Sequence, residues 1–137
     1  MLVATHCHTK YSFDCEMGID SLVNACLKNN ISCTFITDHD VFSLTPRDLA
    51  KFEKNNILII NAIEFTTKEG VHIIGMHTDI KSFEKERYFY SIKQLINILI
   101  FNNGWISIPH PTHSTGVLAA GLDSSDLEYC FKNAHFI

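Results

Sequence analysis

Apolar residues occur along this chain either in short continuous runs or at helical spacing. The continuous runs predict β-strands at residues 2–5, 33–37, 57–65, 71–76 and 105–109. Helical spacing predicts helices over residues 19–27 and 88–99, and residues 123–132 form a further predicted helix. Residues 134–137 resemble the start of another strand. Strands and helices are therefore expected to alternate along most of the chain.

The residues at the ends of these segments match the expected helix boundaries. Thr45 is a predicted N-cap, with Pro46 at the first helical position and the carboxylate of Asp48 at the third. Asparagine and glycine residues end the two amphipathic helices, at 29–30 and 102–104. Alternating elements, with strands that are apolar throughout, predict a mostly parallel α/β sheet or barrel. The direct passage from strand 57–65 to strand 71–76 breaks this alternation once.

Composition and charge agree with a single folded domain. The chain has 137 residues, 46% of them hydrophobic and 19% charged, and a net charge of −4 with neutral histidines. These values exclude a disordered chain, a basic nucleic-acid-binding tail and a coiled coil. The apolar runs are far shorter than the roughly 20 residues of a membrane-spanning helix, and the N-terminus lacks the pattern of a signal peptide. Five cysteines without a C-x-x-C pair predict reduced thiols and a cytoplasmic protein.

Histidines and carboxylates gather where the predicted strands end. These residues are His6, His8, Asp14, Asp38, His39, Asp40, Glu64, His72, His77 and His110. Because the carboxyl ends of parallel strands form the functional face of α/β folds, we expect most of these side chains to converge. Imidazole and carboxylate ligands suit Zn, Mn or Fe, and a glutamate can bridge two ions. The pattern therefore predicts a metal centre.

Each motif alone has a simpler interpretation. The H-x-H motif at 6–8 places two imidazoles on one face of a strand, which is more often polar packing than a metal site. Residues 38–40 can form a turn. A carboxylate at Glu64 is harder to explain, because a buried and unpaired carboxylate is costly. His72 and His77 are five residues apart and point to opposite faces of a regular strand, so only one of them is expected to face the site. Three further residues are interpreted as packing or surface positions: Cys7, His113 and His135.

Five segments occur in an order and spacing that identify a family. They are T-H-C-H-T-K-Y-S-F-D at 5–14, I-T-D-H-D at 36–40, A-I-E-F-T at 62–66, V-H-I-I-G at 71–75 and I-S-I-P-H-P at 106–111. Together they resemble the PHP (polymerase and histidinol phosphatase) family of metallo-phosphoesterases. The resemblance implies an α/β fold, the N-terminal part of a distorted TIM-like (βα)7 barrel, with its metals at the C-terminal mouth.

The resemblance also implies a ligand set for up to three divalent ions, with Zn, Mn or Fe as the expected metals. The implied ligands are His6, His8, Asp14, His39, Glu64, His72 and His110. Glu64 is expected to be shared between an ion at His6 and His8 and an ion at His110. The third ion is expected at the remaining two ligands that follow the first and second strands. His72 is preferred over His77 because it stands in the H-I-I-G motif, and His77 stays open as the alternative.

The implied activity is a metal-dependent phosphoesterase that hydrolyses phosphomonoesters or small nucleotides with a metal-activated hydroxide. Asp40 is the predicted catalytic residue, and Lys10 and His113 are further candidates for proton transfer or phosphate contact. The expected partner is a small phosphorylated substrate, with no membrane and no nucleic acid beyond short nucleotides. Family members usually run further and end with a Gly-Ser-Asp-Ala-His-like motif, so residues 1–137 are expected to form one PHP domain, incomplete at its C-terminus. The alternatives are an exonuclease-like PHP module of a DNA polymerase and a non-catalytic, metal-binding fragment of a truncated gene.

Overall fold

The computed structural model describes residues 1–76 and 90–137. These residues divide into two compact units, Met1–Ile63 and Glu64–Ile137, and each is described by itself. The elements follow one another in the order β1, α1, β2, α2, β3, β4, α3, β5, α4, and the strand order in the sheet is β1-β2-β3-β4-β5. The predicted alternation of strands and helices is confirmed, including its one break between β3 and β4.

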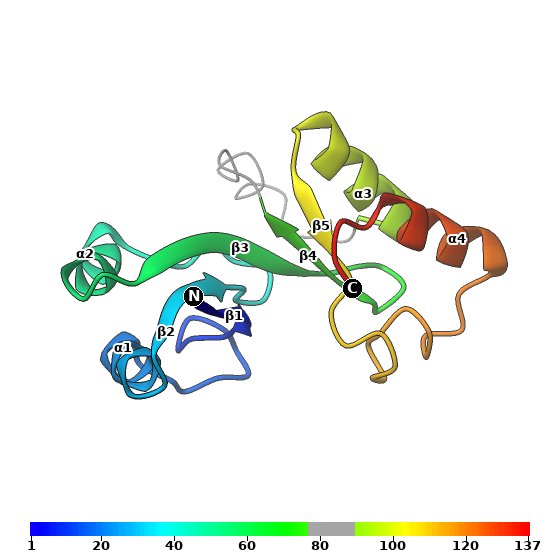
Figure 1. Ribbon diagram of the computed structural model, residues 1–137. Helices are drawn as coiled ribbons and strands as arrows, with labels where there is room; N and C mark the ends of the chain where they lie inside the picture. Colours follow the sequence, from blue (N-terminus) through cyan, green and yellow to red (C-terminus); the bar gives the residue numbers. More distant parts are fainter. Residues whose placement is uncertain (77–89) are drawn as a thin grey trace. The chain divides into compact units, whose positions relative to one another are not determined.

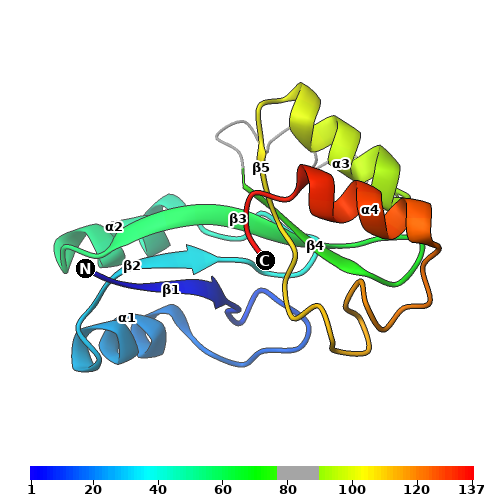
Figure 2. The ribbon, with the colours of Figure 1, turned by 45° about the vertical axis from the view of Figure 1, so that its right-hand side comes forward.

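The first unit contains parallel strands accompanied by two helices (Figures 1 and 2). Its strands are β1 (Leu2–Cys7), β2 (Ile31–Ile36) and most of β3 (Leu58–Thr66). β1 pairs in parallel with β2, and β2 pairs in parallel with β3. Cys7 at the end of β1 lies opposite Ile36 at the end of β2. The residues that follow these two strands therefore start from the same end of the sheet.

Helices α1 (Ile19–Lys28) and α2 (Pro46–Lys54) supply the core of this unit. The buried cluster consists of Ile19, Leu22, Val23, Cys26, Ile36, Leu44, Phe52 and Ile57. Leu27 follows the apolar spacing of the predicted helix but is 47% exposed, so it lies outside the buried face. The predicted start of α2 is confirmed: Thr45 Oγ1 accepts a hydrogen bond from the Asp48 backbone N–H at 3.2 Å, and Asp48 Oδ2 accepts one from the Thr45 backbone N–H at 3.1 Å.

The second unit departs from a purely parallel arrangement. Its strands β4 (His72–Met76) and β5 (Trp105–Ser107) pair in antiparallel orientation. β3 passes into β4 through residues 67–71, a turn closed by a hydrogen bond from the Thr67 backbone N–H to the Val71 carbonyl at 2.9 Å. A parallel partner needs a crossover of a dozen or more residues, so this short turn reverses the chain direction. The strand expected at 134–137 is reduced to one parallel bridge between Phe136 and Ser107.

Helices α3 (Ile92–Phe101) and α4 (Ser124–Asn133) pack side by side in this unit (Figure 2). The apolar residues at helical spacing in α3 are all buried: Ile92, Leu95, Ile96 and Leu99. Ser91 caps α3 in a capping box with Gln94, and the side chain of Asp123 caps α4. α3 begins at Ile92 after the extended N-cap Ser91, so the predicted start of this helix at residue 88 was too early. None of the helices in residues 1–76 and 90–137 has the length and apolar character needed to cross a membrane.

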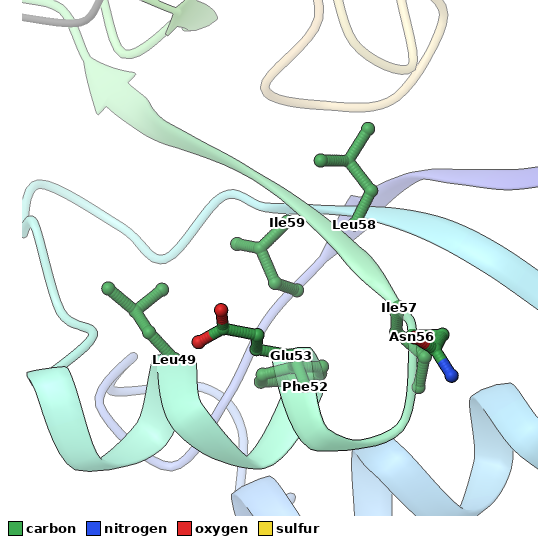
Figure 3. A pocket seen from close by; sticks show the side chains of 7 residues that line it. All are labelled: Leu49, Phe52, Glu53, Asn56, Ile57, Leu58 and Ile59. Carbon is green, nitrogen blue, oxygen red and sulfur yellow. The ribbon is translucent and has the colours of Figure 1, made fainter.

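A pocket of about 370 Å³ lies between α2 and the start of β3 (Figure 3). Its lining residues are Leu49, Phe52, Glu53, Asn56, Ile57, Leu58 and Ile59. Leu58 pairs with Cys33, which in turn pairs with Val3 near the start of β1. The pocket therefore lies toward the amino ends of the strands, away from the end where the predicted site residues of this unit follow.

Candidate metal centre

Two imidazoles meet at the end of β1. The Nε2 atoms of His6 and His8 are 3.0 Å apart, as the H-x-H spacing predicts for side chains on one face of a strand. In a hydrogen bond between two neutral imidazoles, one ring nitrogen donates its proton and the other accepts it. If both nitrogens are deprotonated, their lone pairs can bind one metal ion. Cys7, between them, packs against the buried cluster of the first unit, as expected.

The loop after β1 brings a carboxylate to the second of these imidazoles. Asp14 Oδ1 and Oδ2 lie 3.1 and 3.0 Å from Nδ1 of His8, and Oδ2 lies 3.5 Å from Nε2 of His39. The rings of His8 and His39 meet edge to face at 4.7 Å between centroids. His8, Asp14 and His39 each offer one ligand atom, and these atoms all lie within 4.8 Å of one another. The first unit thus holds a complete two-imidazole, one-carboxylate set.

Asp14 is held in the charged form that a metal requires. Burial by itself raises the pKa of this carboxyl, but hydrogen bonds from Ser12 and His8, together with the charges of His8 and His39, outweigh it and lower the pKa below the ordinary value of 3.8. The carboxylate is 37% exposed, so it is open to solvent on one side. Phe13 stacks on His39 with ring centroids 4.9 Å apart while remaining 84% exposed itself.

Asp38 anchors the loop that carries Asp14. It is fully buried and accepts hydrogen bonds from the backbone N–H of Thr9, from Thr9 Oγ1 at 2.7 Å and from Ser43 Oγ. A buried carboxylate is tolerated because these donors satisfy it. The loop that starts at Thr9 is thereby fixed to the residue directly before His39, so the two segments that bear the ligands hold a common geometry.

The second unit has its own cluster around Glu64. This glutamate is fully buried near the end of β3, and its Oε1 lies 3.0 Å from Nδ1 of His72 and 2.9 Å from Nε2 of His110. The two rings are edge to face, with centroids 5.4 Å apart. Both imidazoles thus converge on one oxygen of one buried carboxylate. This arrangement explains the acidic residue in a strand that is otherwise apolar.

His110 reaches Glu64 from a tightly wound loop. Its backbone has φ of +30°, an unusual value for a side chain with a Cβ. The His113 backbone N–H donates to the His110 carbonyl at 2.9 Å, and the Leu118 backbone N–H donates to the Pro111 carbonyl at 2.9 Å. A Cβ at Gly116 would stand 2.4 Å from both of these carbonyl oxygens, so only glycine fits there. Backbone strain at a polar side chain is characteristic of functional sites.

Residues 4–124 of the chain match the family model described as PHP domain. The chain belongs to the PHP family. This match spans most of the chain and contains all seven implied metal ligands. A comparison with curated proteins finds no match.

Solved structures agree with this PHP assignment at the level of the fold. A Bifidobacterium adolescentis protein, named as a candidate metal-dependent phosphoesterase, superposes with a TM-score of 0.74 at 13% identity, covering 98% of this chain and 75% of that chain. A two-domain Bacteroides vulgatus protein containing a predicted PHP-like metal-dependent phosphoesterase has a TM-score of 0.70 at 17% identity, with coverage of 97% and 42%. A Chromobacterium violaceum amidohydrolase, solved with bound sulfate and without metal, has a TM-score of 0.69 at 12% identity, with coverage of 97% and 73%.

These neighbours confirm the predicted fold class, an α/β fold that corresponds to part of a TIM-like barrel of the PHP type. The chain spans 42% of the two-domain protein and about three quarters of the other two. At these identities the likeness establishes the fold alone.

The remaining predicted PHP site residues lie as follows. His72, the preferred ligand, contacts Glu64, and His77 lies outside the described residues. Asp40 is exposed directly after His39, with a backbone φ of +50°, and its catalytic role stays a prediction. His113 is exposed, and its ring lies 5.3 Å from that of His110 between centroids.

Lys10, a candidate for proton transfer or phosphate contact, and His135, expected to be a packing or surface residue, have separate surroundings. Lys10 is exposed, with Nζ 5.2 Å from the centroid of the Tyr11 ring. His135 packs against Trp105 with ring centroids 6.2 Å apart, and its Nδ1 accepts a hydrogen bond from the Ile106 backbone N–H at 3.1 Å. The packing interpretation of His135 agrees with these contacts.

Sequence reasoning did not single out the residues that support the ligands in this PHP chain. The sequence places Asp38 among the polar residues at the strand ends or in a turn, but does not predict that it holds the Thr9 loop. It does not single out Ser12 or Thr9 either, although all three residues are buried. The sequence indicates such supporting residues only indirectly. A carboxylate directly before a candidate ligand histidine, at the end of an apolar strand, requires hydrogen-bond donors from elsewhere in the chain.

Proposed function

We propose that this chain is a PHP-type metal-dependent phosphoesterase that hydrolyses phosphomonoesters or small nucleotides. A metal-dependent hydrolase is the activity that the PHP match and the structural neighbours support. The observation that carries the metal function is Glu64: a fully buried carboxylate that meets two imidazoles at 2.9 and 3.0 Å. Such a carboxylate needs positive charge beside it.

The ligand chemistry fits divalent transition metals. His8, Asp14 and His39 would hold one ion, and Glu64, His72 and His110 would hold another. Each set supplies three nitrogen or oxygen ligands, the number with which catalytic sites commonly bind a metal and leave a position for water. Imidazole and carboxylate without thiolate favour Zn, Mn or Fe over softer metals. The assignment of Glu64 to a further ion with His6 and His8 belongs to the proposal, as an inference from the resemblance.

Divalent ions in such sites lower the pKa of a coordinated water to near 7 and offset charge on a phosphoryl group. The protein's own groups supply the rest. Asp14 and Glu64 balance the charge of the ions, and the loop at His110 fixes one imidazole rigidly. Asp40, exposed beside His39, would accept or return the proton of the hydrolysis, and Lys10 and His113 would contact substrate phosphate oxygens.

The substrate class is the part of the proposal that the neighbours leave open. Phosphoesters agree with the named role of two of them, and the sulfate bound to the amidohydrolase shows that the third admits a tetrahedral oxyanion. Amide hydrolysis is the second candidate, on the likeness to that amidohydrolase. Assays of p-nitrophenyl phosphate and p-nitroacetanilide with the same Mn- or Zn-loaded protein separate the two.

A charge-removing substitution at Glu64 tests the metal function. We expect Glu64→Gln to lose most of the Zn or Mn that the wild-type protein retains after gel filtration, measured by mass spectrometry, and to lose at least about 100-fold in hydrolysis. Glu53→Gln is the matched control, because Glu53 lines the pocket of Figure 3, toward the amino ends of the strands. Equal metal content in wild type and Glu64→Gln would contradict the proposal.

Three general expectations complete the proposal. Residues 1–137 act as one PHP domain, which the match over 4–124 supports because it spans both compact units. The protein acts in the cytoplasm on a small phosphorylated substrate. All five cysteines are free thiols, in agreement with a reducing compartment.

A further inference from the structure

We infer that Ser12 is a positioning residue for the metal set of the first unit: its hydroxyl joins His39 to Asp14 and sets the orientation of the Asp14 carboxylate. The inference rests on the proposed metal function of His8, Asp14 and His39. Ser12 is buried, and it is not itself a ligand of the kind that Zn, Mn or Fe prefer.

The direction of each hydrogen bond at Ser12 follows from the chemistry of its partners. The backbone N–H of His39 can only donate, and its nitrogen lies 3.1 Å from Ser12 Oγ, which therefore accepts. The one hydroxyl proton of Ser12 is then directed at Asp14 Oδ1, 2.6 Å away. This distance is in the range of a charge-assisted bond from a hydroxyl to a carboxylate.

The Ser12 bond leaves Oδ2 of Asp14 as the oxygen that faces both imidazoles. Oδ1 accepts from Ser12 and lies 3.1 Å from Nδ1 of His8, while Oδ2 lies 3.0 Å from Nδ1 of His8 and 3.5 Å from Nε2 of His39. Asp14 is 37% exposed, so packing alone does not prevent its side chain from rotating into solvent. The Ser12 bond opposes that rotation and keeps Oδ2 toward the two imidazoles.

Ser12 is itself fixed without any contribution from a metal. Its backbone N–H donates to the Thr9 carbonyl at 2.9 Å. Thr9 is held by two hydrogen bonds to the buried carboxylate of Asp38, the residue directly before His39. The loop and the His39 segment are therefore tied together twice, once through Asp38 and once through Ser12. This preorganisation lowers the cost of assembling the ligand set.

Three variants of the full chain test the inference by visible-absorption titration with Co²⁺. We expect Ser12→Ala to weaken Co²⁺ binding by roughly 10- to 100-fold, the usual effect of removing a group that orients a ligand. Ser12→Thr keeps the hydroxyl and should restore affinity to within a few-fold of wild type. Tyr11→Phe is the matched control: it removes one hydroxyl of the same loop, hydrogen-bonded to Asp48 at 2.9 Å, and should leave Co²⁺ affinity unchanged.

The metal-free protein provides a second readout. In wild type, the Ser12 hydroxyl proton should be protected from solvent and visible by NMR, and Ser12→Ala should shift the imidazole ¹⁵N signals of His8 while Tyr11→Phe should not. Exchange of the wild-type hydroxyl too fast to observe would overturn the inference, as would equal loss of Co²⁺ affinity in Ser12→Ala and Tyr11→Phe. If wild type binds no Co²⁺ but the hydroxyl is protected and the His8 signals shift, the proposed metal function fails and the positioning role stands.

Discussion

Glu64 and Asp14 are both carboxylates beside two imidazoles, yet their surroundings differ. Glu64 is fully buried, and its contacts with His72 and His110 fall on a single oxygen. Asp14 is partly exposed and shares its two oxygens among Ser12, His8 and His39. Because an unpaired buried carboxylate costs more than an exposed one, loss of a partner should matter more at Glu64. The second unit is therefore where single substitutions should remove the most metal.

The sequence left two candidates, His72 and His77, for one metal ligand. The contact of His72 with Glu64 at 3.0 Å supports the choice of His72 as the ligand. We expect His72→Ala to lose metal from the Glu64 set and His77→Ala to keep it, measured as metal per chain by mass spectrometry. Loss of metal in His77→Ala with His72→Ala unaffected would show that His77 is the ligand instead.

Some site contacts could be predicted from the sequence and others could not. The neighbouring imidazoles of His6 and His8 follow from strand alternation, which is a local rule. The contact of Asp14 with His8 depends on how the loop from Thr9 folds back, and that fold depends on hydrogen bonds to Asp38, 29 residues further along the chain. Local patterns contain no information on such partners, so the supporting residues could be found only in the structure.

At the scale of elements, the start of α2 was predicted in most detail. The capping box of α2 was readable because Thr45, Pro46 and Asp48 act within one turn. The antiparallel pairing of β4 with β5 was not predicted, since these short, mostly apolar strand sequences contain no signal for direction. The sequence did predict that no helix separates β3 from β4. The short turn that joins them reverses the chain direction, because a parallel partner would need a longer crossover.

The N-terminus of α2 makes stability depend on pH. Burial by itself raises the pKa of Asp48, but hydrogen bonds from Thr45 and Tyr11 outweigh it and lower the pKa below 3.8. A carboxyl with a lowered folded-state pKa stabilises the fold above its unfolded pKa and loses that contribution as the pH falls through the folded value. We expect Asp48→Asn to cost about 1–2 kcal/mol at pH 7, and the difference from wild type to shrink below about pH 4.

Urea unfolding of metal-free protein between pH 3 and pH 7 measures this effect. Asp20→Asn is the matched control, because Asp20 is exposed and pairs with Lys51 at the surface. That control should change the free energy of unfolding by less than about 0.5 kcal/mol. A difference between Asp48→Asn and wild type that stays constant down to pH 3 would show that the Asp48 charge does not stabilise α2.

At the scale of the whole molecule, each compact unit carries its own three-ligand set. His8, Asp14 and His39 belong to Met1–Ile63, and Glu64, His72 and His110 belong to Glu64–Ile137. The resemblance to the PHP family implies that Glu64 is a shared ligand. It assigns Glu64 to an ion with His6 and His8 as well as to an ion with His110. Metal content of combined variants tests that assignment.

A double-mutant cycle between His6 and Glu64 decides whether the two sets work as one centre. If Glu64 is shared, Glu64→Ala already removes the ion at His6, so the His6→Ala/Glu64→Ala variant should lose no more metal per chain than Glu64→Ala alone. His6→Ala alone should lose about one ion per chain, the ion that the resemblance assigns to His6, His8 and Glu64. Glu53→Ala combined with His6→Ala is the control and should behave as His6→Ala. If the metal losses of the two single variants add in the double variant, Glu64 and His6 bind separate ions. The prediction that Glu64 is a shared ligand would then be wrong.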